Sequence, residues 1–465
     1  MNSKFNLSKF ALVFLFLLFT TSARADDVDE YVRRVLGERH IPGAAVAVIK
    51  NGKIVKVEGY GLASVEFNIP ATKDTVFEIG SISKQMTAAA ILLLVEEGKI
   101  NLDKKISKYL SATPDSWKNV SVRNLLTHTS GIKSYTALGG FELSKRYSRD
   151  DFIKTLGVEP LDFETGSRYS YSNSGYNLLG FIIETVSGKS YWDFMRERIF
   201  KPLGMNQTAD RDPRYIIRNR ATGYEWENGA LVGRDYDLTD VFSAGAIVST
   251  VTDLAKWDAA WRDGKFLRKE TKTLAWTPVT LTDGKPYPYG FGWRLAEIRG
   301  HKLIAHSGQT AGFGASISRF VDDDLTVIAL TNLGESGMGT LLAQGVAKLY
   351  IPAMSLKALK AQTETDAKIS PMISNALREG LENKFNADAL TAELIKSLST
   401  ERAKANNQRI NSFGAIKAIV FVGADTSGAT KIYRYKAETP KRIFLWRFGI
   451  NAEGKISEMT LEEEE

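Results

Sequence analysis

The chain has 465 residues, which is more than one hydrophobic core usually holds, so we expect two domains, or one large domain with an appendage. Its composition, 43% hydrophobic and 25% charged, is that of an ordinary globular protein. The formal net charge is +7, but lysine and arginine are spread without a polybasic run, so nucleic acid is not an expected partner. Cysteine is absent, which excludes disulfides, thiol catalysis and cysteine-bound metals.

Residues 1–25 have the pattern of a secretory signal peptide. Two lysines precede an apolar run at residues 10–19, and Ala23-Arg24-Ala25 forms a small-x-small cleavage site. The apolar run is short for a bilayer span, although a single membrane anchor is the alternative. We expect an exported protein, periplasmic or secreted, without a stable membrane span once the leader is removed.

A β-sheet is expected to open the mature chain and to be completed much later. Residues 41–50 and 54–60 have strand patterns joined by Asn51-Gly52, a dipeptide typical of hairpins. Strand patterns return at residues 302–305 and 315–330, while the sequence between is mostly helical. The sheet of this large domain is therefore predicted to draw strands from both of its ends.

A serine and a lysine open the most apolar helix that the sequence predicts. Ser81 and Lys84 precede a charge-free run at residues 86–95, which should be buried on nearly every face. A second Ser-x-x-Lys, at residues 130–133, contains Gly131, which disfavours a helix. Only the first match places its serine and lysine on one helical face.

The start of a helix suits a nucleophilic serine. Its free backbone N–H groups and positive dipole end favour the negative oxygen that develops when a serine attacks a carbonyl. Burial is expected to lower the pKa of Lys84, which then helps to take the serine proton. The competing interpretation is that Ser81 only caps the helix while Lys84 reaches a solvated edge.

The C-terminal part of the chain is predicted to be a separate small domain. We expect a large domain over residues 26–353, a lysine-rich linker over residues 354–369 and a small α+β domain over residues 370–465. The small domain shows two helical patterns and then four strand patterns separated by turn residues. This order loosely resembles the cystatin-like fold.

Two further motifs give the large domain a family resemblance. Tyr171-Ser172-Asn173 is the only Tyr-x-Asn in the chain, and His306-Ser307-Gly308 is the only His-x-Gly. With Ser81 and Lys84 they resemble the three ordered motifs of the serine β-lactamase and penicillin-binding superfamily, in the variant of class C β-lactamases and D-alanyl-D-alanine carboxypeptidases. Flanking segments agree at residues 125–131, 202–205, 289–293 and 330–332.

The resemblance implies a fold and a set of site residues. The fold is α+β, an antiparallel sheet flanked by helices with a mostly helical subdomain, and the site lies between them. Ser81 is the implied nucleophile, with Lys84 and Tyr171 as shared acid/base machinery; which of the two takes the first proton stays open. The implied substrate-binding residues are Asn173, His306, Ser307, Gly308 and Gln309, and the backbone N–H groups of Ser81 and Gln309 would form the oxyanion hole.

His306 departs from the pattern of many relatives, which carry a lysine there. A permanent cation suits a β-lactam carboxylate, whereas histidine is charged only part of the time near neutral pH. We therefore predict a serine hydrolase that forms an acyl-enzyme on Ser81 and acts on D-amino-acid peptides or amides or on small esters. The alternatives are a β-lactamase and a non-catalytic peptidoglycan or partner receptor.

No metal or cofactor is expected, because the chain has four histidines, no cysteine and no His-Glu-x-x-His. The expected partner is a small molecule or a peptidoglycan-type peptide. Hydrolysis versus acyl transfer, the oligomeric state and the role of the small domain stay open.

Overall fold

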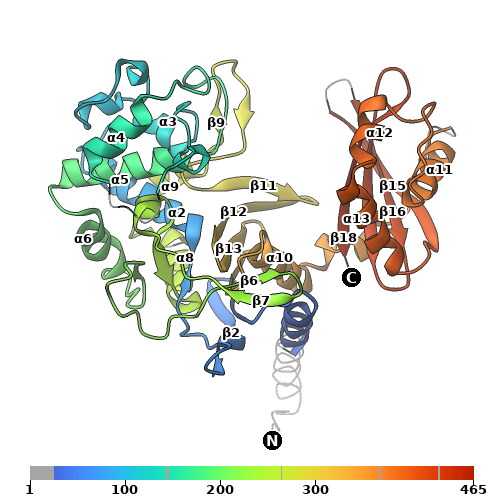
Figure 1. Cartoon of the computed structure of the whole chain (residues 1–465), viewed down its shortest axis with the longest axis horizontal. Helices are drawn as coiled ribbons and strands as arrows, with labels where there is room; N and C mark the ends of the chain where they lie inside the picture. The colour runs from blue at the N-terminus through green and yellow to red at the C-terminus, as the bar shows by residue number, and fades with distance from the viewer. Residues whose placement is uncertain are drawn as a thin grey trace, which may run out of the picture. The chain divides into compact units, whose positions relative to one another are not determined.

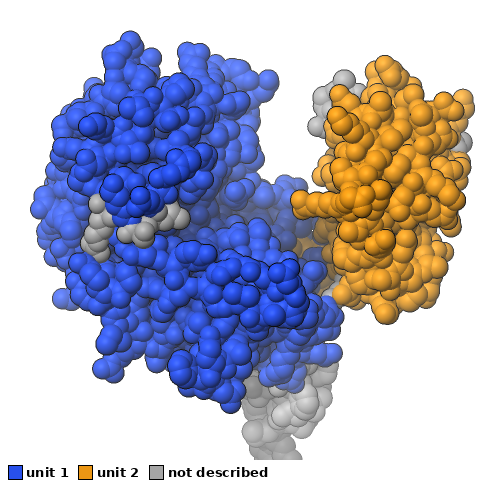
Figure 2. All heavy atoms as spheres, in the orientation of Figure 1, with its two compact units in different colours: residues 1–350 blue, residues 351–465 orange. Residues whose placement is uncertain are grey.

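The computed structural model describes residues 26–142, 145, 147–262, 264–364, 366, 368–427 and 430–464, so the predicted leader lies outside the described residues. The chain divides into two compact units, Met1–Tyr350 and Ile351–Glu465, which Figure 2 shows in blue and orange. The sequence predicts the end of the large domain at residue 353. Within the described residues, no helix is both long enough and apolar enough to cross a membrane.

An antiparallel sheet of seven strands forms the centre of unit 1 (Figure 1). Its strand order is β11 (Arg294–Ile298), β12 (His301–Thr310), β13 (Phe313–Phe320), β14 (Leu325–Thr331), β1 (Gly43–Lys50), β2 (Lys53–Ser64) and β3 (Ile69–Pro70). Strand β1 pairs with β14, and Val46 of β1 lies opposite Ala329 of β14. Strands from both ends of the unit therefore meet in one sheet, and the predicted α+β class is confirmed.

Helices cover both faces of this sheet, which explains why its central strands are apolar throughout. Every residue of β13 and β14 is buried, as expected for strands covered on both faces. Side chains of Ala45, Ala47 and Ile49 share a core with α8 (Val251–Arg262). The alternate residues of β1 point to the opposite face, where α10 (Met338–Tyr350) contacts β13 and β14.

Several further helices of unit 1 form the helical part, which contains a buried α2 (Ser83–Glu96). They are α3 (Val122–Leu126), α4 (Arg149–Gly157), α5 (Asn173–Ser187), α6 (Tyr191–Met195), α7 (Phe242–Gly245) and α9 (Lys269–Ala275). Both α5 and α7 contact α2. Gly180 permits this arrangement, because a Cβ there would collide with Ser243 and with the ring of Phe242.

Short strands and a hairpin complete unit 1. A small sheet has the order β4 (Phe77–Glu78), β8 (Ile247–Ser249) and β5 (Ala209–Asp210). Two further strand pairs are β9 (Val279–Thr280) with β10 (Pro286–Tyr287), and β6 (Tyr224–Glu227) with β7 (Ala230–Gly233). Since β4 leads directly into the predicted nucleophile, its pairing with β8 anchors the start of α2.

Unit 2 is an antiparallel meander with three helices. The helices are α11 (Ile369–Leu381), α12 (Ala392–Leu398) and α13 (Glu401–Ser412), and the strands, in sheet order, are β15 (Ala418–Ser427), β16 (Thr430–Glu438), β17 (Ile443–Ile450) and β18 (Ile456–Glu464). Residues from all three helices share one core with Trp446 and Phe448. The predicted linker contributes Leu356, which is fully buried beside Val422 and Leu445.

The sequence analysis missed α13, for a physical reason. Ile410 is the only residue that this helix buries, so it has almost no apolar periodicity from which a helix is predicted. Its start is instead set by Thr400, whose side chain accepts a hydrogen bond from the N–H of Ala403.

Replacing Gly180 by alanine should destabilise unit 1, because the added methyl group collides with α7. We expect a loss of about 1–3 kcal/mol in the free energy of unfolding. The matched control is Gly37→Ala in the helical segment 26–38, where a Cβ meets no atom and a gain of about 0.4–1 kcal/mol is expected. Urea unfolding followed by tryptophan fluorescence suits the test, because seven of the eight tryptophans precede residue 351. Equal effects of the two substitutions would contradict this packing.

Candidate active site

Ser81 lies in the single turn η1 (Gly80–Ile82) that leads into α2. The preceding Gly80 has a φ of +49°, a conformation that side chains rarely adopt, and a Cβ there would lie 2.6 Å from the backbone nitrogen of Gln309. Glycine therefore lets β12 approach the start of α2 closely. Ser81 itself is half-buried.

Lys84 is fully buried, one turn after Ser81. Its Nζ lies 3.0 Å from Ser81 Oγ, 2.8 Å from Asn173 Oδ1 and 2.7 Å from the carbonyl oxygen of Ala244. These partners come from η1, α5 and α7. Burial lowers the pKa of Lys84 well below its ordinary value.

The second Ser-x-x-Lys has a different environment. Ser130 and Lys133 lie outside any helix, and Lys133 forms an ion pair with Glu159 at 3.0 Å. The structure therefore gives this lysine a carboxylate partner and not a serine. Only the first Ser-x-x-Lys lies at the start of a helix, as the helix-disfavouring Gly131 in the second one predicts.

Tyr171 lies against both Lys84 and His128. The centre of its ring is 4.8 Å from Lys84 Nζ and 4.3 Å from the centre of the His128 ring. Burial raises the pKa of Tyr171, and the nearby Ser81 hydroxyl opposes this increase. The Tyr171 hydroxyl is buried and no residue in the described ranges makes a well-formed hydrogen bond with it. The phenol is therefore neutral in the free protein.

His306 is a residue of β12, and its side chain is buried inside the protein. Only 2% of it is exposed, and both ring nitrogens have partners: Nε2 is 3.0 Å from Tyr289 Oη and Nδ1 is 2.7 Å from the carbonyl oxygen of Ser307. Burial lowers the pKa of His306 to about 3. The histidine is neutral at physiological pH.

The next three residues of β12 pass over the nucleophile. Ser307 and Gln309 are exposed, whereas Gly308 is buried. A Cβ on Gly308 would collide with the carbonyl of Ile79 and would lie 3.2 Å from the backbone nitrogen of Ser81. The start of α2 and this part of β12 therefore approach each other closely at Ser81 and Gln309.

Four residues of the site escaped the sequence analysis as site residues. Ala244 contributes a carbonyl, and His128 and Tyr289 are buried beside Tyr171. Arg294 follows the flanking motif at residues 289–293, and its Cζ lies 6.0 Å from the centre of the Tyr171 ring. It is exposed, and no carboxylate in the described part of the chain pairs with it. The sequence signal that could have identified Arg294 is its position directly after the motif at residues 289–293.

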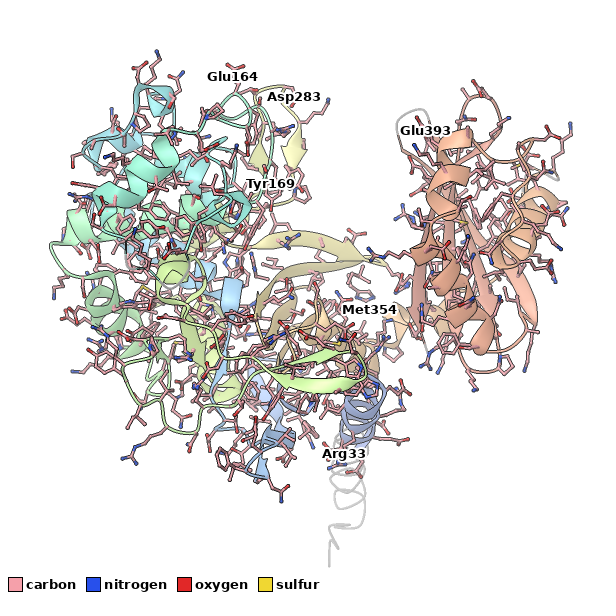
Figure 3. All side chains as sticks on the ribbon, in the orientation of Figure 1. Arg33, Glu164, Tyr169, Asp283, Met354 and Glu393 are labelled. Atoms are coloured by element: carbon pink, nitrogen blue, oxygen red, sulfur yellow. The ribbon has the colours of Figure 1, made fainter. Side chains whose placement is uncertain are left out.

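Aromatic rings extend from this cluster toward β10. The ring of Tyr169, labelled in Figure 3, stacks on Tyr287 with 4.0 Å between centres and lies 5.4 Å from Tyr289. Burial also raises the pKa of Tyr169. The site is therefore bordered by neutral rings on this side.

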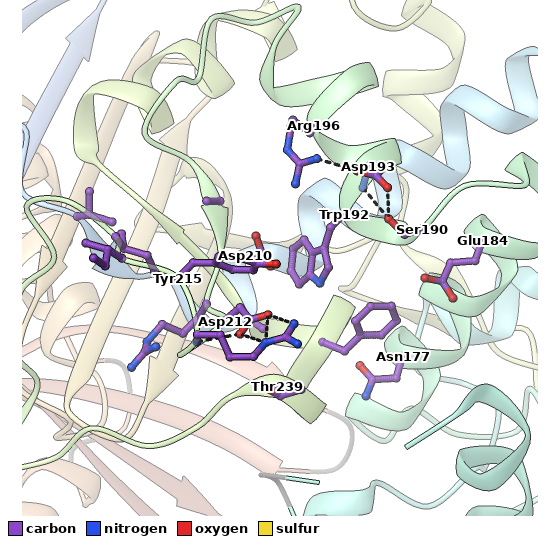
Figure 4. Close-up of a pocket in the computed structure, with 18 of the residues that line it drawn as sticks. Asn177, Glu184, Ser190, Trp192, Asp193, Arg196, Asp210, Asp212, Tyr215 and Thr239 are labelled. Carbon is purple, nitrogen blue, oxygen red and sulfur yellow. Dashed lines mark hydrogen bonds and ion pairs between the residues drawn. The ribbon is translucent and has the colours of Figure 1, made fainter. Parts of the chain in front are cut away.

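A cavity of about 950 Å³ lies apart from these residues (Figure 4). Its walls include Asn177, Trp192 and Phe242, and none of the predicted site residues lines it. Asn177 Oδ1 nevertheless accepts a hydrogen bond from the backbone nitrogen of Ala244 at 3.2 Å. The cavity therefore borders α7, whose Ala244 carbonyl accepts a hydrogen bond from Lys84.

Comparison with known proteins agrees with this geometry. The family model for Beta-lactamase matches residues 28–350. Penicillin-binding protein 4* of Bacillus subtilis is 32% identical over 321 residues, in a match that covers 64% of this chain and 70% of that protein. The matched segment spans 64–70% of the length of such relatives.

Solved structures share the fold. The octameric penicillin-binding protein homologue of Pyrococcus abyssi has a TM-score of 0.62 at 24% identity and covers 94% of this chain and 98% of its own. The D-amino acid amidase of Ochrobactrum anthropi has a TM-score of 0.60 at 26% identity and covers 70% of this chain and 97% of its own. From the extent of the family match and the fold that its members share, the chain belongs to the Beta-lactamase family of serine hydrolases.

Proposed function

We propose that the protein is an exported hydrolase that forms an acyl-enzyme on Ser81 and acts on D-amino-acid amides or peptides, or on small esters. The observation that carries this proposal is the buried amine of Lys84, held 3.0 Å from Ser81 Oγ by two other oxygen atoms. The pattern of residues 1–25 supports export, to the periplasm or the medium.

Lys84 is the proposed base for the first proton transfer. The Ala244 carbonyl oxygen and Asn173 Oδ1 can only accept hydrogen bonds. They therefore accept from the two N–H groups of a neutral amine. The lone pair of Nζ is then directed to the hydroxyl hydrogen of Ser81. The lowered pKa of Lys84 leaves the amine neutral and able to accept this proton.

Tyr171 is the proposed proton donor to the leaving group. Its raised pKa keeps the phenol protonated in the free enzyme, close to Ser81. After acylation begins, Lys84 carries the proton from Ser81 and lies 4.8 Å from the Tyr171 ring, where a cation favours the developing phenolate. Lys84 can then return a proton to Tyr171, which leaves both groups as they started.

The surroundings of Ser81 support an uncharged substrate group beside β12. Since His306 is neutral, the segment of β12 at residues 306–309 offers no cation for a carboxylate, which argues against efficient β-lactam turnover. The similarity to a D-amino acid amidase supports amide hydrolysis. A carboxypeptidase is the second candidate, because the exposed Arg294 beside Tyr171 is suited to a terminal carboxylate.

Intact-protein mass spectrometry tests the nucleophile directly. The wild type should gain one adduct from a fluorophosphonate, and Ser81→Ala should gain none, because the only activated hydroxyl is removed. Exposure to a penicillin asks separately whether the pocket accepts β-lactams. A wild type that reacts with neither reagent would favour the receptor alternative.

The acylation rate should fall as the pH is lowered through the folded pKa of Lys84, because the protonated amine is no longer a base. This decrease should lie well below the ordinary lysine value of about 10.4. Lys84→Arg, which stays charged, should lower the acylation rate by about 10²–10⁴-fold. Lys133→Arg in the second Ser-x-x-Lys is the matched control and should retain the wild-type profile. An unchanged profile in Lys84→Arg would exclude Lys84 as the base.

Arg294→Gln should separate the two candidate substrate classes. For a D-alanyl dipeptide with a free carboxylate, loss of a charge-assisted hydrogen bond should raise KM by about tenfold or more. For the corresponding C-terminal amide, KM should change little, and Arg294→Lys should recover part of the loss. Equal effects on both substrates would mean that Arg294 binds no carboxylate.

A further inference from the structure

Four hydrogen bonds in a row join the Tyr-x-Asn segment to β12. The backbone nitrogen of Ser172 lies 3.1 Å from His128 Nδ1, and His128 Nε2 lies 3.2 Å from Tyr289 Oη. Tyr289 Oη lies 3.0 Å from His306 Nε2, and His306 Nδ1 lies 2.7 Å from the carbonyl oxygen of Ser307. We call these five groups the histidine–tyrosine chain; the side chains within it are at most 2% exposed.

The two end groups of the histidine–tyrosine chain determine the position of every proton in it. The backbone N–H of Ser172 only donates, so His128 Nδ1 accepts, and Nε2 of the neutral ring carries the proton. The Ser307 carbonyl only accepts, so His306 Nδ1 carries the proton and Nε2 accepts. Tyr289 therefore accepts from His128 and donates to His306, and every member of the chain is satisfied.

Protonation of either histidine would break this order. A proton on His128 Nδ1 would face the N–H of Ser172, and a proton on His306 Nε2 would leave the Tyr289 hydroxyl hydrogen without an acceptor in the chain. An unsatisfied buried polar group is costly. Geometry alone therefore favours two neutral rings.

The charges around the chain act in the same direction. The titratable or charged groups that face His306 from the packed elements are Lys84 on α2, Arg294 on β11, and Tyr171, Tyr289 and His128. Burial comes first in lowering the pKa of both His306 and His128, and the charge of Arg294 adds to it. No carboxylate is among the groups that act on these two rings in the described structure.

We propose that His128, Tyr289 and His306 are positioning residues that hold Tyr171 and the β12 segment of the oxyanion hole in register, and that His306 does not contact the substrate. The proposal rests on the proposed function of Ser81. It reassigns His306, which the sequence analysis places among the substrate-binding residues. Both nitrogens of this buried ring are occupied, so it has no free group to offer.

The two end groups of the histidine–tyrosine chain show which parts of the site it positions. Ser172 stands between Tyr171 and Asn173, so a bond to its N–H restrains the backbone of both, and the His128 ring packs on Tyr171 at 4.3 Å. At the other end, the ring of His306 and the carbonyl of Ser307 restrain the start of the segment that reaches Gln309. A proton donor and an oxyanion donor on separate elements are thus tied together without a charge.

Nitrogen NMR of the full-length protein labelled with ¹⁵N-histidine tests the proton order. The chain has four histidines; His40→Gln and His301→Gln, outside the histidine–tyrosine chain, identify the two reference signals. We expect His128 as the Nε2–H tautomer and His306 as the Nδ1–H tautomer, with neither titrating between about pH 5 and 8. Titration of His306 near the ordinary value of about 6.5, or the opposite tautomer, would overturn the proposal.

A double-mutant cycle tests whether the chain acts through Tyr171. Tyr289→Phe removes one oxygen and should lower the acylation rate constant for a nitrophenyl ester by about 10–100-fold. In a Tyr171→Phe background the same change should have little further effect, because residues that act as a unit are not additive. Tyr109→Phe, which removes a hydrogen bond to the backbone nitrogen of Asn101 outside the histidine–tyrosine chain, is the matched control and should leave the rate within about twofold.

The outcomes are distinguishable from failure of the proposed function. A fully additive effect of Tyr289→Phe would mean that Tyr289 supports only the fold and would overturn the proposal. If Ser81 accepts no acyl group while both tautomers are as stated, the proposed function fails and the proton order stands. If Ser81 is acylated while His306 titrates normally, the reverse holds.

Discussion

The site depends on one unfavourable act, the complete burial of the Lys84 amine beside Ser81. An uncompensated buried charge is costly, so the amine loses its proton or finds partners. Here it finds two acceptors and one hydroxyl, on three different elements. The packing of the helical part follows from this requirement, because α5 and α7 must both reach α2.

A second constraint is the approach of β12 to the start of α2. The backbone nitrogens of Ser81 and Gln309 serve one oxyanion only if no side chain separates the two segments. Gly80 and Gly308 supply the two bare positions, one on each segment. Glu78 adds a buried link, since its carboxylate accepts from Thr310 at 2.7 Å and from Arg211 at 3.0 Å. Helix start and strand are thus joined by backbone proximity and by one buried carboxylate.

Parts of this site are readable from sequence because they are local. Ser81 and Lys84 are three residues apart, so helical spacing alone brings them together, and an apolar run predicts their burial. Tyr171, Asn173 and His306 could be assigned only by resemblance, because no local rule relates them to Ser81. The carbonyl of Ala244 lies 160 residues from Lys84 and carries no side-chain signal at all.

The same distinction applies to the fold. Strands with buried faces, such as β1 and β14, have apolar patterns and were predicted, whereas α13 buries one residue and was not. The partner of each strand is a matter of tertiary structure. The pairing of β1 with β14 could be inferred only as a sheet split between both ends, without its register.

Neutrality in the free enzyme is what these features have in common. Burial lowers the pKa of Lys84 and raises that of Tyr171, and the groups at the two ends of the histidine–tyrosine chain favour neutral tautomers of its two histidines. In a buried site, where charges interact strongly, charge then develops only when Ser81 attacks, and fixed dipoles meet it. Arg294 is a cation at the exposed border of this neutral region. In the proposed function, recognition of an anionic substrate group falls to Arg294, because His306 on β12 is a buried neutral ring, and discrimination between amide and carboxylate substrates depends on the Arg294 side chain.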